Sequence, residues 1–389
     1  MKLNNYKILF IFRMIKILLN LFLDSFFVLY FMTLSNNNIV PFGLYKLISI
    51  TVLYITIFLL RNKCKTNNRI NLLRIGLLLY LVYFLLILLL RENIVKYMYL
   101  IGILYGLQEG FYFSVFNIFE SDSISNFERP KYNGNCRTMS NILSIIFPLL
   151  LGGLITISNY STSFIIIICL ITSLILISFA IKDIKIKESK KTNLRAYYQI
   201  VKKNKALQNI YNANIFSGLT YSSGAFLSII TIYIIKVCNS SMSLGIYTSI
   251  IAFIVAFIAF LFGHVIKKKM YIKIIYITMF MSVLGLVLLI FKCNYVTIIL
   301  FSLLAKISWE FIYLVNLTSQ GNLTNIEEIK NDYKVEFYQF FELSLFIGRI
   351  ISFSIFLLIA IIPVNYILPI FILFLLGFMI TSVNIQKNI

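Results

Sequence analysis

The amino-acid sequence predicts an all-α integral membrane protein with about twelve transmembrane helices in two parallel six-helix halves. Of its 389 residues, 60% are hydrophobic and only 13% are charged, whereas about a quarter of the residues of a soluble domain are charged. Apolar runs of the roughly 20 residues needed to cross a hydrocarbon core recur along the chain. These runs are continuous rather than alternating, which favours helices over the strands of a membrane barrel.

Hydropathy divides the chain into twelve spans. The first apolar stretch contains Arg13, Lys16 and Asp24 and has no small-residue cleavage site, so we expect a retained helix rather than a signal peptide. The spans are predicted at residues 8–34, 42–60, 70–90, 96–119, 138–158, 162–181, 208–235, 242–264, 271–291, 294–319, 336–361 and 363–383.

Basic residues collect in alternate loops, and this sets the predicted orientation. The N-terminal end, the 61–74 loop and the 182–205 segment are rich in Lys and Arg. By the positive-inside rule these segments and both termini are cytoplasmic. The net charge of +21 is therefore assigned to a membrane surface, and no nucleic-acid partner is expected. The opposite loops contain only Arg91, Lys96, Lys236 and Lys292.

The two halves of the chain repeat each other at an offset of 201 residues. The repeat predicts an N-terminal six-helix bundle at 1–181, a basic cytoplasmic linker on the inner membrane surface at 182–206, and a C-terminal six-helix bundle at 207–389. With six crossings each, the halves enter the membrane in the same direction. Span starts that match at this offset include Gly43 with Leu244, Ile70 with Tyr271, and Leu100 with Phe301.

Acidic residues deep in the spans are the strongest candidates for function. Glu109 and Tyr112 lie at the repeat offset from Glu310 and Tyr313, and Asp24 lies inside the first span. Intramembrane carboxylates are costly, so the match favours a shared ancestry or role over coincidence.

The arrangement of spans resembles the major facilitator superfamily over essentially the whole chain. The loop between the second and third helices of that superfamily carries a Gly-x-x-x-Asp-basic-x-Gly pattern, and here residues 61–69 keep only its positive charge. The corresponding segment 263–269 has the glycine and the basic run but no acid. The charge relay attached to that motif therefore lacks its acid in both halves.

The fifth span contains a proline followed by a glycine pair. Pro148, Gly152 and Gly153 resemble the Gly-Pro-x-x-Gly-Gly antiporter signature of drug exporters, but the glycine before the proline is missing and one extra residue precedes the pair. The resemblance implies antiport. The alternative interpretation is structural, because proline and glycine in membrane helices often mark a kink or a close helix contact.

In the resembling fold, the first, fourth, seventh and tenth helices line the central cavity. The resemblance therefore implies that Asp24, Glu109 and Glu310 face the substrate path. Desolvation favours the protonated form of a carboxylate, so these three acids are predicted to bind a proton or a cationic substrate. Asp24 and Glu109 are preferred because neither has a basic neighbour within one helical turn.

The other deep charges have two possible interpretations. Lys306 with Glu310, and Glu342 with Arg349, share helix faces and fit either structural ion pairs or parts of the transport path. Basic side chains near span ends are predicted to snorkel to the interface. These are Arg13, Lys16 and Lys46.

Further substrate contacts are predicted at Arg349, Tyr112, Asn212 and Tyr221. Asn212 and Tyr221 belong to a polar stretch of the seventh span, interpreted either as a hydrogen-bonding wall or as a flexible helix bordering water. No metal or other cofactor is expected, because His264 is the single histidine and the five cysteines lack metal-ligand spacing.

The predicted function is secondary active transport by alternating access, with the halves rocking about a site near the midplane. The deep acids and the fifth span favour proton-coupled export of an amphipathic or cationic compound by a monomer in a bacterial inner membrane. The alternatives are a gradient-coupled importer of a polar nutrient such as a sugar, and a non-transporting relative such as a sensor or lipid scramblase. An enzyme is disfavoured, because no cluster of His, Asp and a nucleophile is present. The chain has no phosphate-binding Gly-rich loop, so its energy is expected from a gradient.

Overall fold

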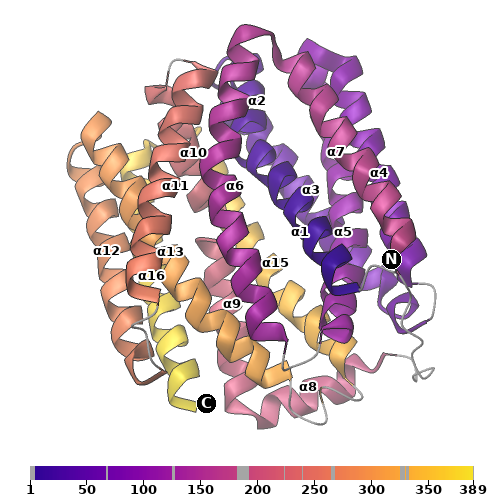
Figure 1. Cartoon of the computed structure of the whole chain (residues 1–389). Coiled ribbons are helices and arrows are strands. Elements are labelled where there is room, and N and C mark those ends of the chain that lie inside the picture. Colours follow the sequence, from indigo (N-terminus) through magenta and orange to yellow (C-terminus); the bar gives the residue numbers. More distant parts are fainter. Residues whose placement is uncertain are drawn as a thin grey trace. The chain divides into compact units, whose positions relative to one another are not determined.

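The computed structural model describes residues 5–66, 69–124, 128–181, 192–222, 224–238, 240–263, 268–324, 329 and 333–388. These residues are almost entirely helical, which confirms the predicted fold class (Figure 1). The chain divides into two compact units, Met1–Thr192 with Cys238–Ile250, and Asn193–Val237 with Ile251–Ile389. His264 and residues 182–191 of the predicted linker lie outside the described residues.

The first unit contains the helices of the predicted N-terminal spans. The first span is a single path of three segments, α1 (Asn5–Leu21), the π-helical η1 (Phe22–Phe27) and α2 (Val28–Leu34). The remaining helices are α3 (Ile39–Leu60), α4 (Arg69–Leu90), α5 (Met98–Ser123), α6 (Arg129–Ile157) and α7 (Tyr160–Ala180), with short 3₁₀ turns η2 (Lys63–Lys65) and η3 (Arg91–Ile94). Two of them begin at asparagine caps, because Asn38 and Asn159 accept hydrogen bonds from the backbone N–H groups of Val40 and Thr162.

Glycines bring α5 against α3. A Cβ atom at Gly106 would lie 2.5 Å from the Ser49 carbonyl oxygen, and one at Gly110 would lie 2.5 Å from Cβ of Thr56. With Gly102, these glycines recur every four residues and form one face of the helix, which allows close backbone approach in a membrane. This packing fixes the rotation of α5 and so the direction of the polar side chains on its other faces.

A second close approach lies between α6 and the start of α11 (Ser241–Gly263), whose residues up to Ile250 belong to the first unit. A Cβ atom at Gly152 would lie 2.6 Å from the Ser241 carbonyl oxygen, and one at Gly245 would overlap the Pro148 carbonyl oxygen. The Tyr160 hydroxyl lies 3.2 Å from the Ser241 hydroxyl. The proline and glycine of the fifth span therefore form a close helix contact.

The second unit contains α8 (Leu194–Lys203), α9 (Lys205–Leu219), α10 (Ala225–Val237), the remainder of α11, a 3₁₀ turn η4 (Lys268–Met270), α12 (Tyr271–Phe291), α13 (Tyr295–Thr324), α15 (Lys334–Leu358) and α16 (Val364–Asn388). Helix α8, in the predicted linker, packs onto this unit through Tyr197, whose hydroxyl lies 2.6 Å from that of Tyr211. The Glu336 carboxylate accepts a hydrogen bond of 2.9 Å from the Asn193 backbone N–H at the start of α8.

The seventh span is not one continuous helix, contrary to the prediction for residues 208–235. It breaks between α9 and α10, where α15 satisfies the freed backbone groups. The Ser352 hydroxyl donates to the Leu219 carbonyl oxygen at 2.8 Å and accepts from the Ala225 N–H at 2.9 Å. Irregular backbone is tolerated at membrane depth where protein groups satisfy it in this way.

Within the described residues, ten helices are long and apolar enough to cross a membrane. The other two predicted spans are α5, whose polar residues lower its hydropathy, and the broken pair α9 and α10.

Candidate functional site

A buried ion pair between α1 and α5 is the chemical centre of the first unit. The Lys16 ammonium lies 2.5 Å from Oε1 of Glu109. Both residues are about 5% exposed. The same carboxylate oxygen accepts a second hydrogen bond, 2.7 Å long, from the side-chain amide of Gln108. The pair keeps the site electrically neutral, which satisfies two charges that would be costly alone at this depth.

Two tyrosine rings complete the surroundings of the Lys16 ammonium. Its nitrogen lies 4.5 Å from the ring centre of Tyr80 on α4 and 4.8 Å from that of Tyr112 on α5. Both distances are within the range of a cation–π interaction. The Tyr112 ring is itself stacked on Phe116, with ring centres 4.9 Å apart. We call Glu109, Tyr80 and Tyr112 the ammonium cage.

The prediction that Lys16 snorkels to the interface is wrong. Its side chain is 6% exposed and points to Glu109, 93 residues away in the sequence. The snorkelling rule considers the depth of a residue on one helix, whereas here a second helix supplies an acid within reach of the ammonium. Glu109 thus has its basic partner on another helix rather than on its own.

Asp24 lies in the π-helical segment η1 and its side chain is exposed. A π-helical turn inserts an extra residue and re-aims the side chains around it, and such turns are frequent at functional sites. The Asp24 carboxylate lies close enough to Tyr80 and Tyr105 for its charge to act on both phenol groups. Asp24 therefore belongs to the same polar region of the first unit as the ammonium cage.

Two further ion pairs join the last turns of α5 to the middle of α1 and to the start of α4. Arg13 and Glu120 are 2.9 Å apart, and Glu120 also accepts a hydrogen bond of 2.7 Å from the Tyr132 hydroxyl. Arg69, which is 1% exposed, lies 2.7 Å from Asp122. The end of α5 thus supplies the acid that the 61–69 loop lacks. The residue spacing within the loop could not reveal this partner.

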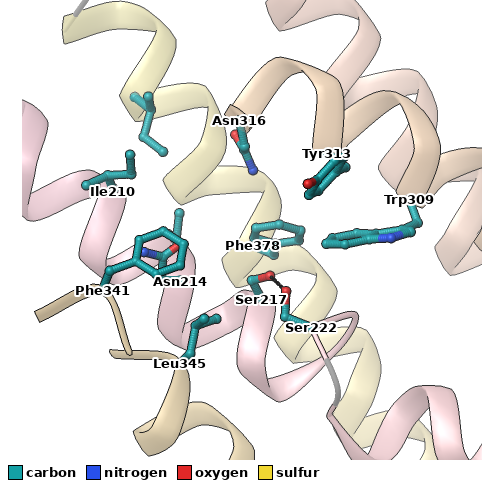
Figure 2. Close-up of a pocket in the computed structure, with 12 residues that line it drawn as sticks. Ile210, Asn214, Ser217, Ser222, Trp309, Tyr313, Asn316, Phe341, Leu345 and Phe378 are labelled. Atoms are coloured by element: carbon teal, nitrogen blue, oxygen red, sulfur yellow. Dashed lines mark hydrogen bonds between the residues drawn. The ribbon is translucent and has the colours of Figure 1, made fainter. Parts of the chain in front are cut away.

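The second unit encloses a small cavity between α9, α13, α15 and α16 (Figure 2). Its volume of about 60 Å³ is enough for about two water molecules. Asn214, Ser217 and Ser222 line it on one side, and Trp309 and Asn316 on the other.

Unsatisfied amide groups border this cavity. Neither Nδ2 of Asn214 nor Oδ1 of Asn316 has a hydrogen-bond partner among the described residues, although both atoms are buried. The Asn316 amide nitrogen is held by the Ser382 hydroxyl at 3.3 Å, and the hydroxyls of Ser217 and Ser222 lie 2.8 Å apart. The residues that line the cavity therefore include one amide nitrogen and one amide oxygen without a hydrogen-bond partner among the described residues.

The remaining predicted site residues occupy different places in the second unit. The Tyr221 ring stacks on Trp309 at 5.1 Å, which places it directly behind the cavity lining. Arg349 donates to the Ser222 carbonyl oxygen and lies 3.7 Å from the Glu342 carboxylate. Glu310 is 4% exposed, whereas Asn212 is exposed and Asn214, two residues later, lines the cavity.

The model of the Major Facilitator Superfamily matches residues 14–324, which is most of the chain. The chain belongs to the major facilitator superfamily. As a member it is a multi-pass integral membrane protein and a membrane transporter of a small substrate, and the predicted family and fold are confirmed.

Proteins that are similar to the chain include a bacterial protein of known sequence and solved transporter structures. It is 25% identical over 348 residues to the uncharacterized protein YqgE of Bacillus subtilis (strain 168), covering 88% of this chain and 80% of that one. A bacterial homologue of the iron transporter ferroportin in an inward-facing state has a TM-score of 0.65 at 12% identity, covering 98% of both chains. A bacterial metal transporter has a TM-score of 0.61 at 13% identity, covering 100% of this chain and 99% of that one.

Proposed function

We propose that this transporter exports a cationic or amphipathic compound in exchange for protons, and that Glu109 is the group that binds either the proton or the cation. The observation that carries the proposal is the buried carboxylate of Glu109, 2.5 Å from an ammonium group. A carboxylate in apolar surroundings needs a positive partner, and a proton and a cation compete for the same negative charge. Exclusive occupancy of one site is the basis of exchange.

Proton binding at Glu109 would remove the partner of the buried Lys16 ammonium. Removing one member of a buried ion pair costs about 3–5 kcal/mol. A penalty of that size is enough to shift a two-state equilibrium strongly. Protonation would therefore favour a conformation in which Lys16 reaches water, which couples proton binding to alternating access.

A positively charged cargo agrees with the two similar solved structures, a bacterial homologue of an iron transporter and a bacterial metal transporter. In this chain the aromatic rings of Tyr80 and Tyr112 favour an organic cation. The face of an aromatic ring stabilises an ammonium group, whereas transition metals prefer nitrogen, oxygen and sulfur ligands.

The test is transport of fluorescent organic cations by the purified protein in proteoliposomes with an imposed pH gradient. We expect gradient-driven flux in the wild type and its loss in Glu109→Gln. Glu92→Gln, which changes an exposed carboxylate in η3, is the matched control and should transport normally. Gradient-driven flux that persists in Glu109→Gln would exclude this carboxylate as the coupling group.

The cavity of the second unit favours a second candidate function, import of a polar nutrient. Its amide nitrogen and amide oxygen suit one hydroxyl or amide group of an uncharged compound, since the cavity has room for about two water molecules. Labelled sugars in the same proteoliposomes distinguish the candidates. Sugar accumulation without movement of any organic cation would replace the exporter with the importer.

The location and orientation are part of the same proposal. We place the chain in a bacterial inner membrane with both termini in the cytoplasm, because the basic residues collect in alternate loops. Reporter fusions at Ile389 and in the 91–96 loop test this topology. They should report opposite sides of the membrane.

A further inference from the structure

We propose that the ammonium cage is the binding site for the ammonium group of the cargo, and that Lys16 occupies it as a tethered substitute when no cargo is present. The cargo class that follows is a primary ammonium compound with an alkyl segment beside the nitrogen. The inference rests on the proposed function, because it takes the cargo to be a cation. A binding experiment tests the cage without any measurement of transport.

Three features of the cage suit an ammonium group. Glu109 supplies a carboxylate oxygen at 2.5 Å from the Lys16 nitrogen, which requires both positive charge and an N–H donor. Tyr80 and Tyr112 supply ring faces at 4.5 and 4.8 Å, which stabilise positive charge without directional bonds. The surroundings are dry, since Glu109 and Tyr112 are at most 7% exposed.

A lysine in such a cage also excludes other cations. The tethered ammonium acts as a ligand at a high effective concentration, in the millimolar range for a short flexible tether. A cargo ammonium must displace it, and the displaced lysine is then free to move with the change of conformation. The site is thus never left as an unpaired buried carboxylate, which would be costly in the membrane.

The experiment removes the tethered ammonium and supplies it again from solution. Lys16→Ala deletes a propyl chain with its terminal ammonium, so propylammonium chloride is the direct replacement. We expect the thermal midpoint of Lys16→Ala in detergent to fall below that of the wild type. It should then rise saturably with propylammonium, relative to sodium chloride of equal ionic strength.

Two further ligands and one double variant identify the groups involved. Tetramethylammonium has the charge but no N–H donor, so it should stabilise Lys16→Ala much less than propylammonium. Lys16→Ala combined with Glu109→Gln lacks the carboxylate and should not respond to propylammonium. The wild type should need a higher concentration for any response, because Lys16 competes.

Lys46→Ala is the matched control. Its ammonium also lies over aromatic rings of the first unit, but at 5.6 Å from Phe42 and 5.8 Å from Tyr105. It should not be rescued by propylammonium. If Lys16→Ala does not fold, Lys16→Leu keeps most of the aliphatic stem and leaves room for methylammonium.

Equal responses of Lys16→Ala, the double variant and Lys46→Ala would overturn the cage. A specific rescue together with an absence of proton-driven transport would leave the cage standing and remove only the proposed coupling.

Discussion

The guanidinium of Arg349 donates a hydrogen bond of 2.8 Å to the backbone carbonyl oxygen of Ser222, at the break between α9 and α10. The bond places a positive charge beside the C-terminal end of α9, where the helix dipole is negative. Gly348 adjoins Arg349 on α15, and a Cβ atom there would overlap the Ile215 carbonyl oxygen. Helix α15 therefore determines the conformation of the broken span.

Arg349→Met is expected to destabilise the protein, because a hydrogen bond from a charged donor contributes about 1.5–3 kcal/mol. The measurement is the thermal midpoint in detergent, followed by circular dichroism. Arg74→Met is the control, since Arg74 is half-buried and its bond to the Ser178 carbonyl oxygen is longer, at 3.3 Å. Equal decreases of the thermal midpoint in the two variants would show that the hydrogen bond of Arg349 stabilises the protein no more than that of Arg74.

Gly106→Ala should destabilise the first unit, because its Cβ atom would lie 2.5 Å from the Ser49 carbonyl oxygen and force α5 away from α3. Overpacking of this kind costs about 1–3 kcal/mol. Gly134→Ala on α6 is the control, as its Cβ atom meets nothing within 4 Å. A change at that position should be neutral or stabilising by up to about 1 kcal/mol. The thermal midpoint should therefore fall in Gly106→Ala and stay unchanged or rise in Gly134→Ala. Equal decreases in both variants would contradict the close contact at Gly106.

The Lys16–Glu109 pair should show strong coupling in a double-variant cycle. Glu109→Gln leaves a buried ammonium and Lys16→Met leaves a buried carboxylate, so each single change should cost about 3–5 kcal/mol. The double variant removes both charges and should cost much less than the sum. Chemical denaturation in mixed micelles provides the free energies, and additive costs would contradict a direct interaction.

Cys64 in η2 should resist alkylation. Burial raises the pKa of its thiol to about 12. The thiolate is the reactive form, and at pH 9 about one molecule in a thousand carries it at such a pKa. In single-cysteine variants, iodoacetamide should therefore modify Cys64 far more slowly than the exposed Cys293. Comparable rates would indicate that η2 opens readily.

The same shift predicts a pH dependence of stability. The folded-state pKa of Cys64 lies above the ordinary thiol value of 9.0, so the folded protein holds the proton more tightly than the unfolded chain. The contribution is fully present below pH 9 and is lost as the pH rises toward 12. Cys64→Ala should abolish this part of the alkaline loss in thermal midpoints measured between pH 8 and pH 10.

The fold class could be predicted from sequence, but two local features could not. Hydropathy places α3, α4 and α7 because each is a nearly uninterrupted apolar run. The break after Leu219 is invisible to hydropathy, since contacts from Ser352 and Arg349 on a distant helix decide it. Thr220, Ser222 and Gly224 are a weak local signal of it.

The sequence alone predicts two of the four residues that meet at the ion pair of the first unit. Glu109 and Tyr112 are found by searching for polar residues deep in apolar spans, whereas Lys16 and Tyr80 are missed because each looks ordinary on its own helix. Charge balance was the available signal, because a deep acid in one span requires a base from another. The orphan amides of Asn214 and Asn316 depend on packing between helices and have no such signal.

The division of α11 between the two units has a consequence for split forms of the gene. A chain cut in the 182–206 segment would give a first fragment without residues 238–250, the piece whose Gly245 packs on Pro148 of α6. That fragment would lack the helix that packs closely against Pro148 and Gly152, because the other fragment carries it. Co-expressed halves should therefore complement each other, and the first half alone should be recognised by membrane quality control and degraded.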